Sequence, residues 1–379
     1  FRDIQLKGPF SLWEHTHRFI AEDAGTTIME DEVRFRLPMG IFSRPFYGYA
    51  KKEFERMFSY RHRVLKHDLE NDADRLPKKR ILISGASGTI GNALVPFLRT
   101  CGHEVVRLVR RKEGLAADEL FWDPYKGILD LENAGPFDAV INLNGIDISR
   151  GRWTNKQKRK LIASRTFPTR LLVEKMSELS TKPEVFLSSS AIGYYGDGYD
   201  KALLEESENG ACFIAKTCRR WENQSRAAET VGIRTIQMRI GIVLTPAGGA
   251  LERMELPFKL GLGVKLSHGK QYMSWISMDD ILSSILFLIE NKDVAGPVNL
   301  TAPAPVTNAK FSEILAGVFK RKVYFTMPRF IANLLCGQMG RETLLMSAKV
   351  LPGKLEEHGY KFQHETLLTA FKDVLGRHD

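Results

Sequence analysis

The stretch Arg80-Ile-Leu-Ile-Ser-Gly-Ala-Ser-Gly-Thr-Ile-Gly91 decides the fold of this chain. A short apolar run meets three glycines and then a helical pattern, which is typical of a strand that enters a dinucleotide-binding turn. Gly85 permits a backbone shape that a Cβ would oppose, Gly88 lets the main chain approach a diphosphate, and Gly91 lets the helix lie close to the sheet. The helix N-terminus offers free N–H groups to the phosphates. The predicted cofactor contacts in this turn are Gly85, Ser87, Gly88, Thr89, Ile90 and Gly91.

The residues that follow the turn indicate which nicotinamide dinucleotide is bound. The helical pattern ends at Gly102, and a second predicted strand, 104–109, ends on Arg110 and Arg111. NAD-specific folds place a carboxylate here for the ribose 2′-hydroxyl, whereas two guanidiniums suit a 2′-phosphate. We therefore expect NADP as the cofactor. The alternative interpretation of the arginine pair is a solvated strand end.

Composition limits the classes of function. A chain of 379 residues is too long for one ordinary core, so we expect two domains and an appendage. The net charge of +10 comes from basic residues scattered among acidic ones, which argues against a nucleic-acid partner. We expect no membrane partner, because no apolar run is long enough to span a bilayer. The four cysteines lack disulfide or zinc-site spacing, which fits a cytoplasmic protein.

Residues 1–70 form a different kind of structure. Alternating patterns at 13–19 and 27–37 predict half-buried strands, and 51–69 predicts a long helix. His15 and His17 share a strand face, but no third ligand is evident, so we favour polar packing and assign no metal. The chain begins in mid-pattern, which suggests truncation. The polar residues 71–79 predict a linker.

Two further strand ends are predicted to face the cofactor. Residues 137–145 form a strand followed by a second glycine turn, so Asn144 and Gly145 are expected cofactor contacts. A strand that starts at Val185 leads into three serines and then into Tyr194 and Tyr195. In dehydrogenases of this architecture, a hydroxyl at the place of Ser190 hydrogen-bonds a substrate carbonyl or hydroxyl.

The order of these motifs resembles the extended short-chain dehydrogenase/reductase superfamily, and within it the atypical members called epimerase family proteins, some of which were labelled cell-division inhibitors. The resemblance implies a doubly wound parallel α/β sheet over 80–326 and a small helical C-terminal cap over 327–376. It also implies that Arg165 is a cofactor contact. The resemblance covers nearly the whole chain. Its motifs include the turn at 85–91, Trp153-Thr154, Ser164-Arg165, Ala191-Ile-Gly-Tyr-Tyr-Gly196, Trp221-Glu222, Arg239-Ile-Gly-Ile-Val-Leu244, Gly248-Gly249 and Gly296-Pro-Val-Asn299.

The first segment has a resemblance of its own. Its Gly8-Pro-Phe-Ser-Leu-Trp-Glu-His-Thr-His17 run and its Met57-Phe58-Ser-Tyr60-Arg61 run resemble the end of a helix-grip domain of the polyketide cyclase and lipid-transport superfamily. In that fold a curved antiparallel sheet wraps a long helix around an apolar cavity. The first strands of such a domain are missing here. The resemblance therefore implies a partial α+β segment, and carriage of a hydrophobic ligand would need the missing strands.

One departure from the superfamily limits the functional inference. Its members use Tyr-x-x-x-Lys on the helix after the fifth strand, where the lysine lowers the pKa of the tyrosine. Here the expected spacing falls on Ile214 and Cys218, and Lys216 has Cys212 four residues before it. The usual acid/base pair is therefore missing.

Three interpretations remain. Tyr194 or Tyr195 supplies the proton, with Lys216 as ribose ligand or helper; or substrate or water brings the proton and Ser190 only positions it; or NADPH binds without turnover. We expect reduction or epimerisation of a small hydroxyl- or carbonyl-bearing molecule, with a nucleotide sugar suggested by fold analogy alone. The alternative is a catalytically silent NADPH-binding sensor or scaffold. A homodimer is left open.

Overall fold

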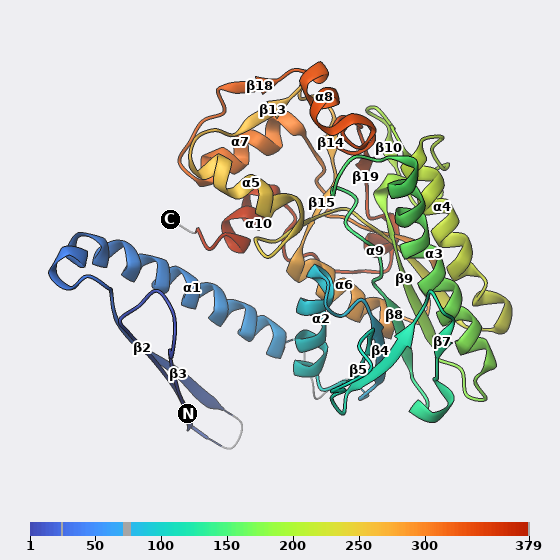
Figure 1. Ribbon diagram of the computed structural model, residues 1–379, viewed down its shortest axis with the longest axis horizontal. Helices are drawn as coiled ribbons and strands as arrows, with labels where there is room; N and C mark the ends of the chain where they lie inside the picture. Colours follow the sequence, from blue (N-terminus) through green and yellow to red (C-terminus); the bar gives the residue numbers. More distant parts are fainter. Residues whose placement is uncertain (24–25, 71–76, 378–379) are drawn as a thin grey trace. The chain divides into compact units, whose positions relative to one another are not determined.

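The computed structural model describes residues 1–23, 26–70 and 77–377 (Figure 1). They divide into two compact units, Phe1–His62 and Arg63–Asp379. Most of the predicted linker, residues 71–76, lies outside the described residues. Within the described part of the chain, no helix combines the length and the apolar composition needed to cross a membrane.

The first unit is a three-stranded antiparallel sheet with a long helix. The strands β1 (Arg2–Ile4), β2 (Leu12–Ala21) and β3 (Thr27–Arg36) lie in that order. The helix α1 (Arg44–Glu70) begins seven residues before the predicted start at 51, because Pro45 fits the first turn of a helix. An aromatic cluster joins sheet and helix: the Phe54 ring centroid lies 5.0 Å from that of Trp13 and 4.6 Å from that of Phe35.

The second unit is built on an eight-stranded sheet of order β16-β11-β9-β8-β4-β5-β6-β7. All neighbouring strands are parallel except β6 and β7. The strands are β4 (Arg80–Ser84), β5 (Glu104–Val109), β6 (Glu119–Asp123), β7 (Ile128–Leu129), β8 (Ala139–Asn142), β9 (Val185–Ala191), β11 (Arg234–Ile240) and β16 (Gly296–Leu300). The doubly wound parallel sheet predicted from the sequence is confirmed.

Helices cover both faces of this sheet. One face packs against α2 (Thr89–Thr100) and α6 (Met278–Glu290), with Leu94, Phe97 and Ile285 in that core. The other face packs against α3 (Asn155–Glu178), whose Leu172 and Met176 are fully buried. The helix α4 (Phe213–Arg226) lies beside α3 (Figure 1).

The strand that begins at Arg234 does not run on without a break to Leu244. This segment forms β11 and a separate β12 (Ile242–Leu244), which pairs with β15 (Trp275–Ser277). The break falls at Gly241, where an added Cβ would lie 2.9 Å from the Ser274 carbonyl oxygen. The strand therefore leaves the main sheet at a point where the chain passes close to a neighbour. A third core around Trp275 includes α5 (Gly249–Lys259) and α7 (Asn308–Val318).

The C-terminal segment is more than the small helical cap that we expected. Its strand β19 (Lys349–Val350) pairs with β10 (Ala202–Leu203), and β18 (Phe325–Met327), at the start of the segment, pairs with β13 (Val264–Leu266). Tyr360 packs in the core that contains α2 and α6, and Phe371 packs in the core around Trp275. The remaining elements of this segment are α8 (Arg329–Met339), the π-helical turn η5 (Gly340–Leu344), α9 (Gly353–Glu357) and α10 (Leu367–Val374).

Candidate functional site

The glycine turn after β4 has the geometry of a phosphate-binding turn. Gly85 has a φ of +78°, and a Cβ there would lie 2.8 Å from the Leu143 carbonyl oxygen. A Cβ on Gly91 would lie 2.7 Å from the Ala86 Cα, so glycine is needed at both positions. Gly88 is the N-cap of α2 and is exposed together with Ser87 and Thr89. The main chain at the helix N-terminus is therefore accessible to an anion.

This turn lies at the switch point of the sheet. Strand β4 pairs with β5 on one side and with β8 on the other, so successive connections run in opposite directions from it. In open α/β sheets, ligands bind at the carboxyl ends of the strands at such a point. The Asn144 side chain joins the two strand ends, because its Nδ2 donates to Ser84 Oγ at 2.6 Å and to Asn142 Oδ1 at 2.8 Å.

Arg165 places a buried positive charge beside this edge. The residue is 8% exposed, and its guanidinium donates to the backbone oxygens of Leu161 at 3.0 Å and Ile146 at 3.1 Å. A Cβ on Gly145 would lie 3.4 Å from the guanidinium carbon, so this loop runs directly over Arg165. Burial lowers the pKa of Arg165. Among the residues that the structure describes, no carboxylate forms an ion pair with Arg165.

The two arginines after β5 are not equivalent in the structure. Arg111 pairs with the buried carboxylate of Glu119, which also binds Arg107 at 3.2 Å. Arg110 is exposed, and no carboxylate among the described residues pairs with it. Arg110 is therefore the more available of the two for an added phosphate.

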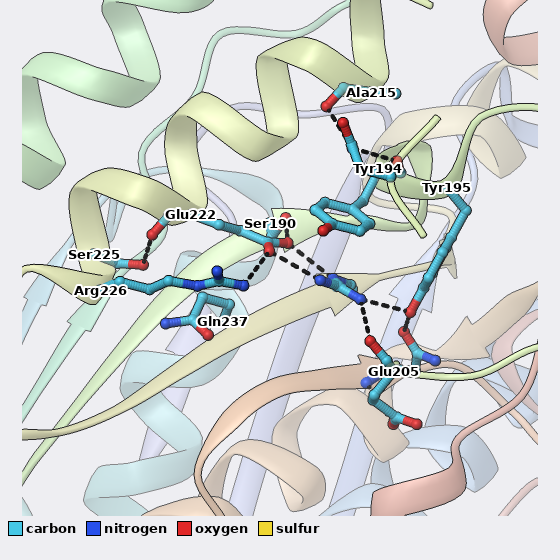
Figure 2. A network of polar contacts seen from close by, with 12 residues as sticks. Ser190, Tyr194, Tyr195, Glu205, Ala215, Glu222, Ser225, Arg226 and Gln237 are labelled. Carbon is cyan, nitrogen blue, oxygen red and sulfur yellow. Dashed lines mark hydrogen bonds and ion pairs between the residues drawn. The ribbon is translucent and has the colours of Figure 1, made fainter. Parts of the chain in front are cut away.

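Ser190 belongs to a buried polar network (Figure 2). It lies near the end of β9, and its Oγ donates to Glu222 Oε1 at 2.7 Å. Glu222 receives two hydrogen bonds from Arg239, at 2.9 and 3.0 Å. The side chains of Glu222 and Arg239 are each 1% exposed. The Ser190 hydroxyl is thus held by a buried ion pair that helix α4 and strand β11 supply.

The two candidate tyrosines have different environments. The Tyr195 hydroxyl donates to Asn299 Oδ1 at 2.6 Å and accepts from Arg239 Nη1 at 2.9 Å. Burial raises the pKa of Tyr195 to about 12, which makes it a weak acid at neutral pH. Tyr194 is only partly buried, and the Arg239 guanidinium lies 3.5 Å from its ring centroid (Figure 2). The Tyr195 hydroxyl is thus buried and bonded on both sides, whereas Tyr194 is the less buried of the two.

Lys216 faces away from this network. It is exposed on α4, whereas Ile214 and Cys218 are buried. The helical period explains the difference, because residues 214 and 218 lie one turn apart on the inner face and residue 216 points outward. The position of Lys216 therefore gives no support to its expected role as ribose ligand or helper.

Sequence reasoning missed the residues that hold Ser190 and Tyr195. Glu222, Arg239 and Asn299 each lay inside a motif noted for the family resemblance, but none was assigned to the site. The available signal was Arg239, a charged residue in a mostly apolar strand; Glu222 stands among charged and polar residues of its helix and gave no such signal. Pairing them requires knowledge of how α4 crosses β11.

The C-terminal segment supports the same network. The buried Glu205 accepts hydrogen bonds from the backbone N–H groups of Asn299 at 3.0 Å and Lys354 at 3.2 Å. Glu342 accepts from the backbone N–H of Ile214 at 3.0 Å, in the first turn of α4. Residues after 340 therefore contact α4, which carries Glu222, and share Glu205 with β16, which carries Asn299.

Helix α5 approaches the glycine turn from the other side. A Cβ on Gly248, just before α5, would lie 2.5 Å from Thr89 Oγ1. Arg253 of α5 pairs with Asp147 of the loop after β8 at 2.6 Å. The edge that carries the predicted cofactor contacts is thus bordered by α5 and by the β8–α3 loop.

Comparison with known proteins shows the family. Residues 81–300 match the model described as the NAD dependent epimerase/dehydratase family. The chain belongs to this family. Residues 327–374 of the epimerase-family chain match a domain of unknown function, DUF1731. An epimerase family protein of Mycobacterium leprae is 38% identical over 290 residues, which cover 76% of this chain and 94% of the relative. One of Staphylococcus haemolyticus is 32% identical over 304 residues, covering 78% and 99%.

Solved structures of similar proteins extend the comparison. A human epimerase family protein, SDR39U1, crystallised with NADPH, has a TM-score of 0.71 and 28% identity and covers 78% of this chain and 98% of its own. A nucleoside-diphosphate sugar epimerase from Corynebacterium glutamicum has a TM-score of 0.76 and 30% identity. It covers 99% of this chain and 74% of its own. These likenesses place this epimerase-family chain among the atypical extended short-chain dehydrogenases/reductases.

Proposed function

We propose that the protein binds NADP(H) and reduces or epimerises a small hydroxyl- or carbonyl-bearing molecule, with a nucleotide sugar as the substrate class to test first. The observation that supports this most is the exposed main chain of Ser87, Gly88 and Thr89 at the start of α2. A side chain at Gly85 or Gly91 would collide with the protein's own backbone, so glycine at these positions lets the turn fold tightly between β4 and α2. The human relative crystallised with NADPH supports the same cofactor.

The cofactor's phosphates would be held by separate parts of the site. Backbone N–H groups at residues 87–89 would bind the diphosphate, as at other helix N-termini. Arg110 would bind the ribose 2′-phosphate, because its guanidinium is exposed while Arg111 is engaged by Glu119. The bound nicotinamide would supply the hydride. The side of the site near Asn144, Gly145 and Arg165 would contact the rest of the dinucleotide.

The proton would come from Tyr194. Its ring lies against Arg239, which is itself fixed by Glu222, so the ring is held in one orientation. Ser190 would orient the substrate oxygen, and its own proton is directed to Glu222. Tyr195 would serve to fix Arg239 and Asn299. This division of roles leaves a single tyrosine for acid/base work.

A second candidate function is supported by the exposed position of Lys216. In short-chain dehydrogenases the lysine of Tyr-x-x-x-Lys lowers the pKa of the tyrosine, and no such pair stands on α4. A protein that binds NADPH without consuming it would need only the phosphate contacts. It would act as a sensor of the reduced cofactor or as a scaffold.

The experiment is to follow the absorbance of reduced nicotinamide in single-turnover reactions with nucleoside-diphosphate 4-keto sugars and simple carbonyl compounds. We expect NADPH to be consumed by wild type. The Tyr194→Phe variant should be slower by roughly a hundredfold or more, because general acid catalysis contributes about that much. The Tyr195→Phe variant is the matched control, and it should lose stability before it loses the chemical step. Tight NADPH binding without consumption by any substrate would favour the sensor.

A further inference from the structure

The first unit gathers histidines and carboxylates on one side of its sheet. In the register of the strands, Asp3 of β1 stands opposite His15 of β2, and His17 of β2 stands opposite Asp31 of β3. His62 of α1 reaches the same carboxylate, with its Nε2 2.9 Å from Asp31 Oδ2. Side chains that are far apart in the sequence therefore come together on this side of the sheet. The sequence pattern of His15 and His17 alone did not reveal the third ligand.

Three of these residues have the spacing of metal ligands. One ring nitrogen from each of His15 and His17 and one oxygen of Asp3 lie within 4.8 Å of one another. The Nε2 of His17 lies 3.5 Å from Asp3 Oδ2. Both histidines are buried, at 7% and 5% exposure, whereas the Asp3 side chain is 65% exposed. An ion could therefore reach the cluster from the side of Asp3 and bind to two fixed imidazoles.

Asp31 is positioned to orient the imidazoles. Its side chain is 2% exposed, and Oδ1 lies within hydrogen-bond distance of His15 Nε2 at 3.0 Å. The Nδ1 of His17 lies 2.6 Å from the same oxygen, so one carboxylate faces a ring nitrogen of each histidine. Buried ring nitrogens are normally satisfied. With Nδ1 turned toward Asp31, the other ring nitrogen of His17, Nε2, faces Asp3 and is the atom that an ion beside Asp3 would bind.

We propose that Asp3, His15 and His17 bind one divalent transition-metal ion of the zinc type, with Asp31 as the carboxylate that orients the histidines. Two imidazoles and one carboxylate, with further positions left for water, form a typical set for such an ion. A carboxylate behind a metal-bound histidine is the usual outer-shell partner. The site lies wholly in the first unit, so it is independent of the NADP(H) function proposed for the second.

The test uses the full chain, purified without a polyhistidine tag and dialysed against a chelator. Titration calorimetry with Zn²⁺ should show one ion bound per chain, and Co²⁺ should give the visible absorption of a low-symmetry site. The His17→Ala variant should lose this binding. The Asp3→Asn variant should weaken it by roughly tenfold or more, and because Asp3 is largely exposed, this change leaves the packing of the unit intact. Far-UV circular dichroism checks that each variant is folded.

His268→Ala is the matched control, because His268 is an exposed histidine of the second unit. It should bind Zn²⁺ as wild type does. The proposal would be overturned if wild type bound no Zn²⁺ at one ion per chain, or if Asp3→Asn and His17→Ala, both folded, bound it with unchanged affinity.

Discussion

Glu222 and Arg239 are the residues on which the geometry of the site depends most. Each is almost completely buried, and together they contact Ser190, Tyr194 and Tyr195. Taking two charges out of water is costly, so a buried pair adds little net stability by itself. Removing one partner is different, because it leaves the other charge buried without compensation.

We therefore predict that Glu222→Ala lowers the free energy of unfolding by about 3–5 kcal/mol. Arg226→Ala is the control, since Arg226 pairs with the same carboxylate at 3.6 Å but is 44% exposed. Exposed pairs contribute about 0–1 kcal/mol, so this change should be nearly silent. Urea denaturation followed by circular dichroism measures both. Equal effects of the two substitutions would show that burial of the pair is not what matters.

Some properties of single residues can be predicted from the sequence, and others cannot. The requirement for glycine at 91 is local, because a Cβ there would meet the backbone of the same turn, and the spacing of the glycines predicts it. Gly85 has a positive φ within the turn, but its collision is with Leu143, which is distant in the sequence. The difference between Tyr194 and Tyr195 is not local. It depends on Arg239 and Asn299, which arrive from two other strands, so adjacent tyrosines looked equivalent in the sequence.

At the level of elements, different glycines of the β4–α2 turn are expected to serve protein stability and cofactor binding. A Cβ on Gly91 would meet the backbone at Ala86 within 2.7 Å, whereas one on Gly88 would have only the Gly85 oxygen near it, at 3.3 Å. Gly91→Ala should thus destabilise the cofactor-free protein by about 1–3 kcal/mol. Gly88→Ala should leave its stability nearly unchanged but weaken NADPH binding, because the side chain would stand where the diphosphate approaches. Thermal unfolding with and without NADPH distinguishes these outcomes; the reverse pattern would contradict the account of the turn.

The C-terminal segment is tied to α6 by a charged histidine. Burial opposes the charge, but hydrogen bonds to Asp280 and Asp373 raise the pKa of His364 to about 9, against an ordinary 6.5. A raised pKa in the folded state means that the stabilisation is complete below about pH 6.5 and is lost as the pH rises through about 9.

We predict that wild type loses on the order of 2 kcal/mol of stability relative to His364→Gln between these pH values. Urea titrations at several pH values measure the difference, in which groups unaffected by the substitution cancel. Parallel pH profiles for the two proteins would show that His364 carries no such charge. His358→Gln is a useful control, because it replaces a histidine on the same segment.

The C-terminal segment was also the element that the sequence described least well. Strands of two residues, such as β10 and β19, are too short to show any alternation, so the sequence does not predict their pairing. The pair Asp279-Asp280 is typical of the start of a helix. In the structure Ser277 is the N-cap of α6, and Asp280 binds its hydroxyl at 2.7 Å while also receiving the backbone N–H of Gln363.

For the whole molecule, the comparisons indicate which part is sufficient for the shared fold. The relatives from Mycobacterium leprae and Staphylococcus haemolyticus align over 94% and 99% of their own length but over only 76% and 78% of this chain. We predict that residues 77–379 alone bind NADPH with an affinity within about threefold of the full chain, which is less than 1 kcal/mol. Fluorescence of bound NADPH measures this. Loss of binding on removal of residues 1–76 would mean that this part of the chain is needed for NADPH binding.

The most direct test of the account is isothermal titration of the full chain with NADPH and with NADH, for wild type and Arg110→Ala. A charge-assisted contact is worth about 1.5–3 kcal/mol, so wild type should bind NADPH at least about tenfold more tightly than NADH. Arg110→Ala should remove most of that difference and leave NADH binding unchanged, whereas Arg111→Ala should have the smaller effect. Equal affinity of wild type for both dinucleotides, or binding of neither, would contradict the account.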